Sequence, residues 1–350
     1  MNDPARVFQH ALGRSVLVLG AAALISARVW AQHEAPQGES DAAPERVAAT
    51  VGGADIYVAQ VNQYVQRVLG NRPVEEAARQ RLQAEALEQL VKQQIVLAVL
   101  EKRGEACNPQ QLDLALARFK DELSRQEKSL EAYCRARGIP VSALVRAMRW
   151  QLSWNSYLEK SLTDENLRQY FEDHRADFDG TKMRVAQILL AWPDDPAQRT
   201  KTEQQAQAIR DDILAGKTSF AAAAQQHSQS PSARDGGALA WISRHEPMPE
   251  FFARAAFQLK AGEISPPVVS PLGVHLIQCV EIEPGQKAWQ DVRDELTAAV
   301  KEHLFEWNVT QAGTQPDVKY TGAVPHFRPG TRVVVIPEHD VDPATERTGK

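Results

Sequence analysis

The segment 183–282 constrains the fold more than any other part of this 350-residue chain. It begins with the apolar run VAQILL at 185–190, which is typical of a buried strand. Gly216 ends the helical pattern that follows, since glycine readily takes the left-handed conformation after a helix. In chain order the segment predicts a strand over 184–190, helices over 196–215 and 219–227, a strand over 239–242, a helix over 249–257 and a strand over 273–282. Such alternation predicts a small sheet flanked by helices.

Several short motifs punctuate this segment in a fixed order. They are Phe220-Ala221, His227-Ser228, Gly236-Gly237, Leu239-Ala240-Trp241, Met248-Pro249, Phe251-Phe252, Gly262-Glu263 and Gly273-Val274-His275. Their order and spacing resemble the parvulin family of peptidyl-prolyl cis/trans isomerases. The resemblance implies an α+β isomerase domain over 182–283 and, as activity, rotation of X-Pro peptide bonds without a cofactor or metal.

The resemblance also implies which apolar side chains hold the substrate. Leu239, Met248 and Phe252 match the positions that form the proline cup of the family, and Phe257 is expected to bind substrate beside them. An aliphatic chain, a flexible thioether and aromatic rings are side chains suited to a shaped apolar surface. Ordinary core packing is the alternative role for each of them.

The polar positions depart in part from the family pattern. Many parvulins carry two histidines near the reacting amide; here His275 keeps the second, and Gln187 replaces the first. Ser230 stands where Cys or Asp is usual, so a negative charge is lost, and Ser270 stands where Thr or Ser is expected. Gln187 can both donate and accept hydrogen bonds, to Ser270 or His275. Hence the catalytic candidates are His275, Ser270, Gln187 and Ser230, with a structural role for His275 as the alternative.

The N-terminal segment has the features of an export signal. Arg6 and Arg14 precede the apolar run SVLVLGAAALI, and Ala31 closes a small-residue cleavage pattern. The run is too short for a typical membrane-spanning helix, which needs about 20 apolar residues. We expect residues 1–31 to be a cleaved signal peptide and the protein to be periplasmic or secreted. An uncleaved inner-membrane anchor facing the periplasm is the alternative, and the polar segment 32–45 is expected to be a flexible leader.

Helical patterns dominate residues 46–178. A hairpin is expected over 47–58 around Gly52-Gly53, and its sequence VAATVGGADIYVAQV resembles the entry to a SurA-like chaperone module. A helix is predicted over 74–103, and Asn108-Pro109 begins the next. Further helices are expected over 130–137, from Ser142 onward and from residue 163 onward. An aromatic group at helical spacing is expected to be core: Trp150, Trp154, Tyr157, Tyr170 and Phe171.

An apolar stripe follows the isomerase-like segment. Trp289, Val292, Leu296, Val300 and Trp307 lie on one face of a predicted helix. In SurA-like proteins the corresponding helix completes the N-terminal helical module, so we expect 288–308 to do so and removal of the chain after Pro284 to destabilise that module. Residues 309–350 are predicted to be an extended tail with one late strand near 333–336.

The predicted class is therefore α+β, with a mostly helical SurA-like domain over 46–178 that helix 288–308 completes, and a parvulin-like domain over 182–283. With 43% hydrophobic residues the chain can form real cores, and a net charge of −5 gives no reason to expect a nucleic-acid partner. Cys107, Cys134 and Cys279 have no zinc-site spacing, and a Cys107–Cys134 disulfide stays open. No metal or cofactor is implied.

Two functions fit these features. One is an exported foldase that isomerises X-Pro bonds in unfolded, proline-containing clients held by the helical module. The other is a holdase chaperone whose parvulin-like domain binds extended peptides with little turnover, which the replacements at Gln187 and Ser230 favour. Recognition of phosphorylated Ser-Pro is the least favoured, because only Arg234 and Arg244 lie near the cup in sequence. Membrane attachment is expected only if residues 1–31 stay uncleaved.

Overall fold

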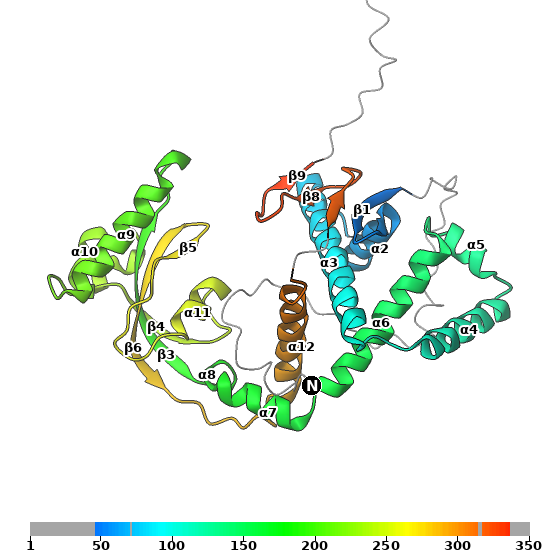
Figure 1. Cartoon of the computed structure of the whole chain (residues 1–350). Coiled ribbons are helices and arrows are strands. Elements are labelled where there is room, and N and C mark those ends of the chain that lie inside the picture. Colours follow the sequence, from blue (N-terminus) through cyan, green and yellow to red (C-terminus); the bar gives the residue numbers. More distant parts are fainter. Residues whose placement is uncertain (1–45, 71, 314–316, 337–350) are drawn as a thin grey trace, which may run out of the picture. The chain divides into compact units, whose positions relative to one another are not determined.

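The computed structural model describes residues 46–70, 72–313 and 317–336, and the chain divides into two units (Figure 1). Unit 1 takes in the described residues up to Thr163 and those from Lys301 onward, and unit 2 is Asp164–Val300. The predictions for 1–31 and 32–45, and for the end of the tail from 337, fall outside the described residues. Within those ranges, no helix is long and apolar enough to cross a membrane.

Unit 1 begins with the predicted hairpin, which is confirmed. Strand β1 (Val47–Val51) pairs antiparallel with β2 (Ala54–Tyr57). Gly52 and Gly53 connect them with φ values of 56° and 83°, the left-handed conformation that tight hairpin turns require and glycine permits. On its other edge β1 pairs with β7 (Val318–Tyr320), so the sheet order is β2-β1-β7.

The helices of unit 1 follow local sequence signals closely. They are α2 (Val58–Leu69), α3 (Glu76–Arg103), α4 (Pro109–Arg125), α5 (Leu130–Arg135) and α6 (Val141–Ser161). Gly104 ends α3 at φ 70°, and the Asn108 side chain accepts from the Gln111 N–H at the start of α4, as predicted. Helix α2 was not predicted, and α6 begins one residue before Ser142 with Pro140 as its N-cap.

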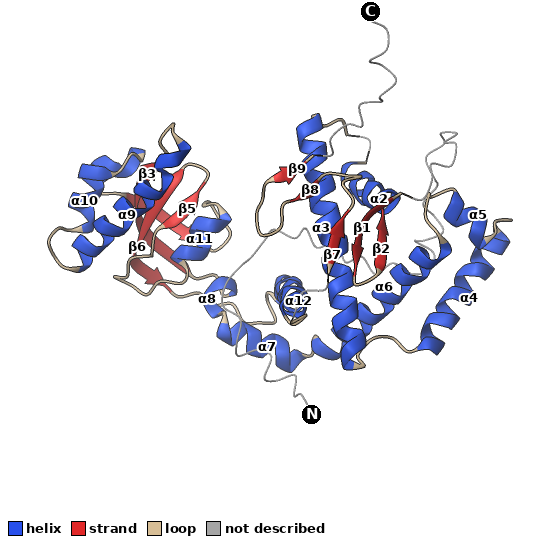
Figure 2. Cartoon of the chain, turned by 45° about the horizontal axis from the view of Figure 1, so that its top comes forward, coloured by secondary structure: helices blue, strands red, loops and turns tan. Residues whose placement is uncertain are grey.

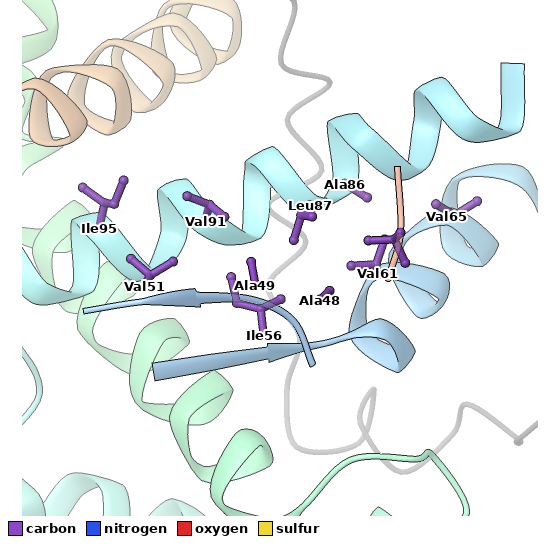
Figure 3. Packing of buried hydrophobic residues seen from close by; sticks show 11 residues of the cluster. Ala48, Ala49, Val51, Ile56, Val61, Val65, Ala86, Leu87, Val91 and Ile95 are labelled. Atoms are coloured by element: carbon purple, nitrogen blue, oxygen red, sulfur yellow. The ribbon is translucent and has the colours of Figure 1, made fainter. Parts of the chain in front are cut away.

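The first core of unit 1 lies between the hairpin and two helices. Figure 3 shows Leu87, Val91 and Ile95 of α3 in one cluster with residues of β1 and β2. These positions are four apart and therefore stack along one side of the helix. Ala49 and Ile56 face them from the strands, with 0% and 1% exposure. Burial of these side chains joins the hairpin to the helical layer.

A second core of unit 1 contains the end of α12 (Arg293–Thr310). Phe305 is buried with Val96 and Leu100 of α3, and its ring packs edge-on against Trp150 and Trp154 of α6 at centroid distances of 6.1 and 5.7 Å. Trp150 and Trp154 stack on each other at 5.5 Å. The predicted helix start near residue 289 is wrong, because Trp289 lies before α12 with the Arg293 guanidinium over its ring.

The chain beyond α12 is more structured than the predicted extended tail. Besides β7, it forms the short pair β8 (His326–Phe327) and β9 (Val334–Val335). Thr321 N–H donates to the Ala48 carbonyl at 3.1 Å, and Val324 is buried in the core between the hairpin and α3. The described residues of the tail therefore belong to unit 1.

Unit 2 contains an antiparallel sheet with helices on it (Figure 2). The sheet has four strands in the order β4-β3-β6-β5. The strands are β3 (Lys182–Ala191), β4 (Ala238–Ser243), β5 (Val268–Ser270) and β6 (Gly273–Glu283). Predictions for β3, β4 and β6 are confirmed, whereas the three-residue β5 was not predicted. The long ladder between β3 and β6 forms the centre of the sheet.

Helices cover both faces of this sheet. Helices α9 (Arg199–Leu214) and α10 (Phe220–His227) pack on Ile188, Leu190 and Leu276. Helix α11 (Glu250–Ala256) packs on the opposite face, against Val185 and Ile277. Because side chains alternate along a strand, Gln187 on β3 and His275 on β6 are directed to the α11 face.

Two helices precede the sheet in unit 2, α7 (Asp164–Asp173) and α8 (Arg175–Phe178). Both helices lie within the range 46–178 that was expected to form the helical domain. In the structure they belong to unit 2. The Tyr170 ring is tilted against those of His174 and Phe178 in unit 2, whereas Trp150, Trp154 and Tyr157 pack in a cluster of unit 1, so the aromatic residues expected as one core are divided between the two units. All three cysteines are buried and free, which leaves no Cys107–Cys134 bridge.

Candidate active site

The register of β3 and β6 brings two site candidates together. Gln187 lies opposite Ile277, and His275 lies two residues along the same strand from Ile277. Diagonal neighbours of this kind project from one face and are within reach of long side chains. The Gln187 Oε1 and His275 Nδ1 atoms are 3.1 Å apart.

Ser230 reaches Gln187 because the segment after α10 runs beside β3. The Gln229 N–H donates to the Leu189 carbonyl at 2.8 Å, and the Leu189 N–H donates to the Ser228 hydroxyl at 3.1 Å. This pairing places the Ser230 Oγ atom 3.0 Å from the Gln187 Nε2 atom, which donates to it. The Ser230 Oγ atom in turn lies 3.0 Å from that of Ser232.

Ser270 is held on the other side of His275 by the turn between β5 and β6. Its Oγ atom lies 2.9 Å from His275 Nε2 and receives the N–H groups of Leu272 at 3.1 Å and Gly273 at 3.2 Å. The Trp192 indole N–H donates to the Ser270 carbonyl at 2.7 Å and fixes the same turn. The four predicted polar residues therefore form one hydrogen-bonded row, the polar row, with Ser232 as a fifth member.

Three members of the polar row are almost closed to water, whereas Gln187 and Ser232 are half-buried. His275, Ser270 and Ser230 are 4%, 5% and 7% exposed. Burial lowers the pKa of His275 below its ordinary value, because removing water penalises the imidazolium. His275 is therefore a neutral imidazole near pH 7, and the row carries no formal charge. Gln187 contacts His275 and Ser230, and Ser270 reaches it only through His275.

The predicted apolar residues gather against the same face of the sheet. Leu239, Met248 and Phe257 are partly buried members of the cluster around Phe252 and Ile277. Phe252 itself is 0% exposed, so it forms the interior of the cluster, and its ring meets the His275 ring edge-on at 5.9 Å. The apolar cluster and the polar row thus share His275 as their common border.

The structure adds residues that sequence reasoning did not select. The Phe251 ring lies 5.6 Å from that of His275, so two consecutive phenylalanines border the polar row. Ser232 extends the row and Trp192 contacts it, both through hydrogen bonds that arise only in the folded chain. The FF pair was visible in the sequence, but no local signal marked Trp192 or Ser232.

Position 237 requires a glycine, because its backbone lies very close to the backbone of Gln187. Gly237 has φ 84°, and a Cβ atom there would lie 2.4 Å from the Gln187 carbonyl oxygen. The Gln187 N–H donates to the Gly237 carbonyl at 2.8 Å. A side chain at this position would therefore displace Gln187 as well as strain the backbone.

Arg244 fixes the loop that carries Met248. Its guanidinium binds both carboxylate oxygens of Glu250 at 2.7 and 2.8 Å, and its Nε lies 3.2 Å from the Asp177 carboxylate. The side chain is only 13% exposed. Because both carboxylates already engage Arg244, it is not a free cation for a phosphorylated substrate. The ion pair of Arg244 with Glu250 joins the two ends of the segment between β4 and α11. Met248 lies in this segment and is thereby held near the apolar cluster.

We expect Glu250→Gln to destabilise unit 2 at neutral pH and to have little effect in acid. The Arg244 hydrogen bonds lower the pKa of Glu250, so their stabilisation is present above the ordinary glutamate pKa of about 4.3 and is lost as pH falls through the lower folded value. Burial raises the pKa of Asp177, which shares Arg244 and protonates earlier. Urea unfolding of both proteins at pH 7 and pH 3 measures the difference. An equal difference at the two pH values would contradict the assignment.

Comparison with known families places the site in a recognised domain. The model of the PPIC-type PPIase (rotamase) domain matches residues 188–281, which contain Ser230, Ser270, His275 and most of the apolar cluster around Phe252. Residues 188–281 are a parvulin domain of the PPIC type. Gln187 lies immediately before the matched range.

Relatives that are similar to the PPIC-type domain and its flanks carry the names foldase, chaperone or putative isomerase. The chain is similar to the foldase protein PrsA of Geobacillus kaustophilus, with 27% identity over 54% of this chain and 57% of the relative. It is 42% identical to the chaperone SurA of Cupriavidus metallidurans over 34% of this chain and 24% of the relative. A putative peptidyl-prolyl cis-trans isomerase, NifM of Klebsiella pneumoniae, is 31% identical over 43% and 58%. The chain thus spans little more than half of these relatives at most.

Proposed function

We propose that this protein is an exported foldase that catalyses cis/trans isomerisation of X-Pro bonds in unfolded polypeptides, with unit 1 holding the client chain. The observation that carries the proposal is the contact between the polar row and the apolar cluster at His275 in a PPIC-type domain. Export is supported by the charged start and short apolar run within residues 1–31. The holding role is supported by similarity to proteins named chaperone or foldase.

Catalysis of prolyl isomerisation needs little more than an apolar surface and a polar border, the roles proposed for the apolar cluster and the polar row. Rotation about an X-Pro bond crosses a barrier of about 20 kcal/mol, and no bond breaks. An apolar surface that excludes water weakens amide resonance, because hydrogen bonds from water stabilise the planar form. We propose that partly buried side chains of the apolar cluster (Leu239, Met248 and Phe257) contact the prolyl ring, with Phe252 as their support, because these residues share one cluster. Interactions that are stronger with the twisted amide then lower the barrier.

The polar row supplies a rigid and uncharged border to that surface. His275 is neutral, and both of its ring nitrogens are engaged by Ser270 and Gln187. Gln187 hydrogen-bonds to His275 on one side and to Ser230 on the other. The row is therefore continuous although Gln187 replaces the first histidine of the family pattern. This continuity favours an isomerase over a domain that only binds peptides. Since no group in the row is charged, we propose that it orients the site and performs no proton transfer.

Ser270→Ala and His275→Ala are expected to reduce turnover by roughly tenfold or more while largely preserving peptide affinity, because each removes at least one hydrogen bond from the row but no apolar contact with the prolyl ring. Thr202→Ala, which truncates a hydroxyl on α9, is the control and should leave turnover unchanged. The measurement is the proline-limited refolding rate of a protein substrate, beside peptide binding by calorimetry. Equal losses of affinity and rate in both site variants would contradict this separation of roles.

The holding role is tested by a second measurement on the full chain. Aggregation of a chemically unfolded protein without proline-limited folding should be suppressed by the native chain and equally by His275→Ala. If suppression disappears in His275→Ala, client holding depends on the isomerase site and not on unit 1. If the native chain suppresses nothing, the chaperone part of the proposal is wrong.

A further inference from the structure

The polar row has a fixed direction, which begins at Ser270. Its Oγ atom has two lone pairs and receives two backbone N–H groups, from Leu272 at 3.1 Å and Gly273 at 3.2 Å. These donors belong to the main chain and cannot reverse. With both lone pairs used, the favoured arrangement is the one in which the oxygen donates its hydrogen to His275 Nε2 at 2.9 Å. The opposite arrangement, in which His275 Nε2–H donates to Ser270 and Ser270 donates to the Gly273 carbonyl at 3.1 Å, brings a third donor to the oxygen and is the less favoured of two states.

The direction passes from His275 to Gln187. In a neutral imidazole one nitrogen accepts and the other donates. Since Nε2 accepts from Ser270, Nδ1 carries the hydrogen and donates to Gln187 Oε1 at 3.1 Å. If the Gln187 amide were flipped, its NH₂ group would face the Nδ1–H group, and two donors would meet without an acceptor. The amide is therefore held with its nitrogen toward Ser230, to which it donates at 3.0 Å.

The last step is set in the same way at Ser230. Its Oγ atom receives Gln187 Nε2 and, at 3.4 Å, the N–H of Ser232. Its own hydrogen is then directed to the Ser232 Oγ atom at 3.0 Å. Ser232 lies in the short 3₁₀ helix η3 (Pro231–Asp235), whose N-cap is Ser230. Backbone donors at both ends thus favour the same direction along five side chains.

We propose that Ser232 is a positioning residue of the isomerase site: as the last acceptor of a one-way hydrogen-bond row, Ser270 to His275 to Gln187 to Ser230 to Ser232, it keeps His275 in the neutral Nδ1–H tautomer. The proposal rests on the proposed function for its effect on turnover, but the tautomer is independent of it. Without the Ser232 hydroxyl, the Ser230 hydrogen loses its acceptor and can turn toward Gln187. The amide then flips, and His275 populates the other tautomer.

The test combines ring-nitrogen NMR of the full ¹⁵N-labelled chain with turnover. The signals of His275 are those absent from His275→Asn. The native chain should show a protonated Nδ1 and an unprotonated Nε2 at pH 7.5. Ser232→Ala should show a mixture of tautomers and a fall in kcat of about two- to tenfold, the effect of one net hydrogen bond, with unchanged peptide affinity. Ser232→Thr keeps a hydroxyl and should restore both properties.

Two results would overturn the proposal: a native His275 protonated at Nε2, or a Ser232→Ala spectrum identical to that of the native chain. A merely structural role of Ser232 predicts reduced stability with an unchanged tautomer, which the same spectrum detects. If the native chain shows the Nδ1–H tautomer and Ser232→Ala mixes it, but neither protein accelerates isomerisation, the row stands and the proposed enzymatic function fails.

Discussion

Phe252→Ala is expected to remove isomerase activity and to destabilise unit 2 by about 3–5 kcal/mol, the usual cost of truncating a buried phenylalanine. Phe252 has 0% exposure and touches both parts of the site, since its ring lies in the apolar cluster and edge-on to His275. The cavity left by the ring would loosen Met248 and admit water to the polar row. Urea unfolding and the rate of peptide isomerisation measure the two effects.

Two further variants separate the loss of activity from the loss of fold. Leu214→Ala truncates a side chain on α9 that is 58% exposed, so its stability should change by no more than about 0.5 kcal/mol and its activity should persist. Met248→Ala removes a partly buried member of the cluster and should reduce activity with a smaller stability cost. If Met248→Ala were fully active, the apolar cluster would not be the surface that binds proline.

Phe305→Ala is the second large effect, and we expect it to destabilise unit 1 by about 3–5 kcal/mol. Phe305 is 6% exposed and packs on Val96, Leu100, Trp150 and Trp154, although it is distant from them in sequence. The same helix is tied by Lys92–Glu306 at 2.9 Å and by Arg103 to Asn308 at 3.2 Å. Its loss should therefore open α3 and α6.

Hydrogen exchange gives the readout for Phe305→Ala. Amides of α3 and α6 should lose protection, while those of β3 and β6 in unit 2 should keep it. Leu114→Ala, which truncates a side chain on α4 that is 53% exposed, is the control for a harmless truncation in unit 1. Unchanged protection of α3 and α6 in Phe305→Ala would mean that the end of α12 contributes little to unit 1.

Local signals explain which elements the sequence predicted well. Gly104 and Asn108 mark the boundary between α3 and α4 through their own backbone and side-chain preferences, and the structure agrees within a few residues. Helix α2 was not predicted, because its buried positions, Val61 and Val65, are β-branched residues that favour strands. The three-residue β5 is too short to show a period.

Non-local pairing explains most of the rest. Strand β7 exists because β1 offers an edge far away in sequence, and no pattern within 309–350 identifies that partner. The four predicted polar residues came from family resemblance, whereas Ser232 required the path of the chain beside β3. Arg244 was noted as a basic residue near the cup, but only its contacts with Glu250 and Asp177 reveal it as a structural clamp.

The most direct test is NMR exchange of the cis and trans forms of a short X-Pro peptide, measured with its affinity for the native chain, for Phe252→Ala and for the double variant Gln187→His, Ser230→Asp. We predict that the native chain accelerates exchange well above the uncatalysed rate and that Phe252→Ala does not. If the two replacements limit the native enzyme, the double variant is faster still. A native rate equal to that in buffer, unchanged in the double variant while the peptide still binds, would contradict the foldase account and leave a peptide-holding chaperone.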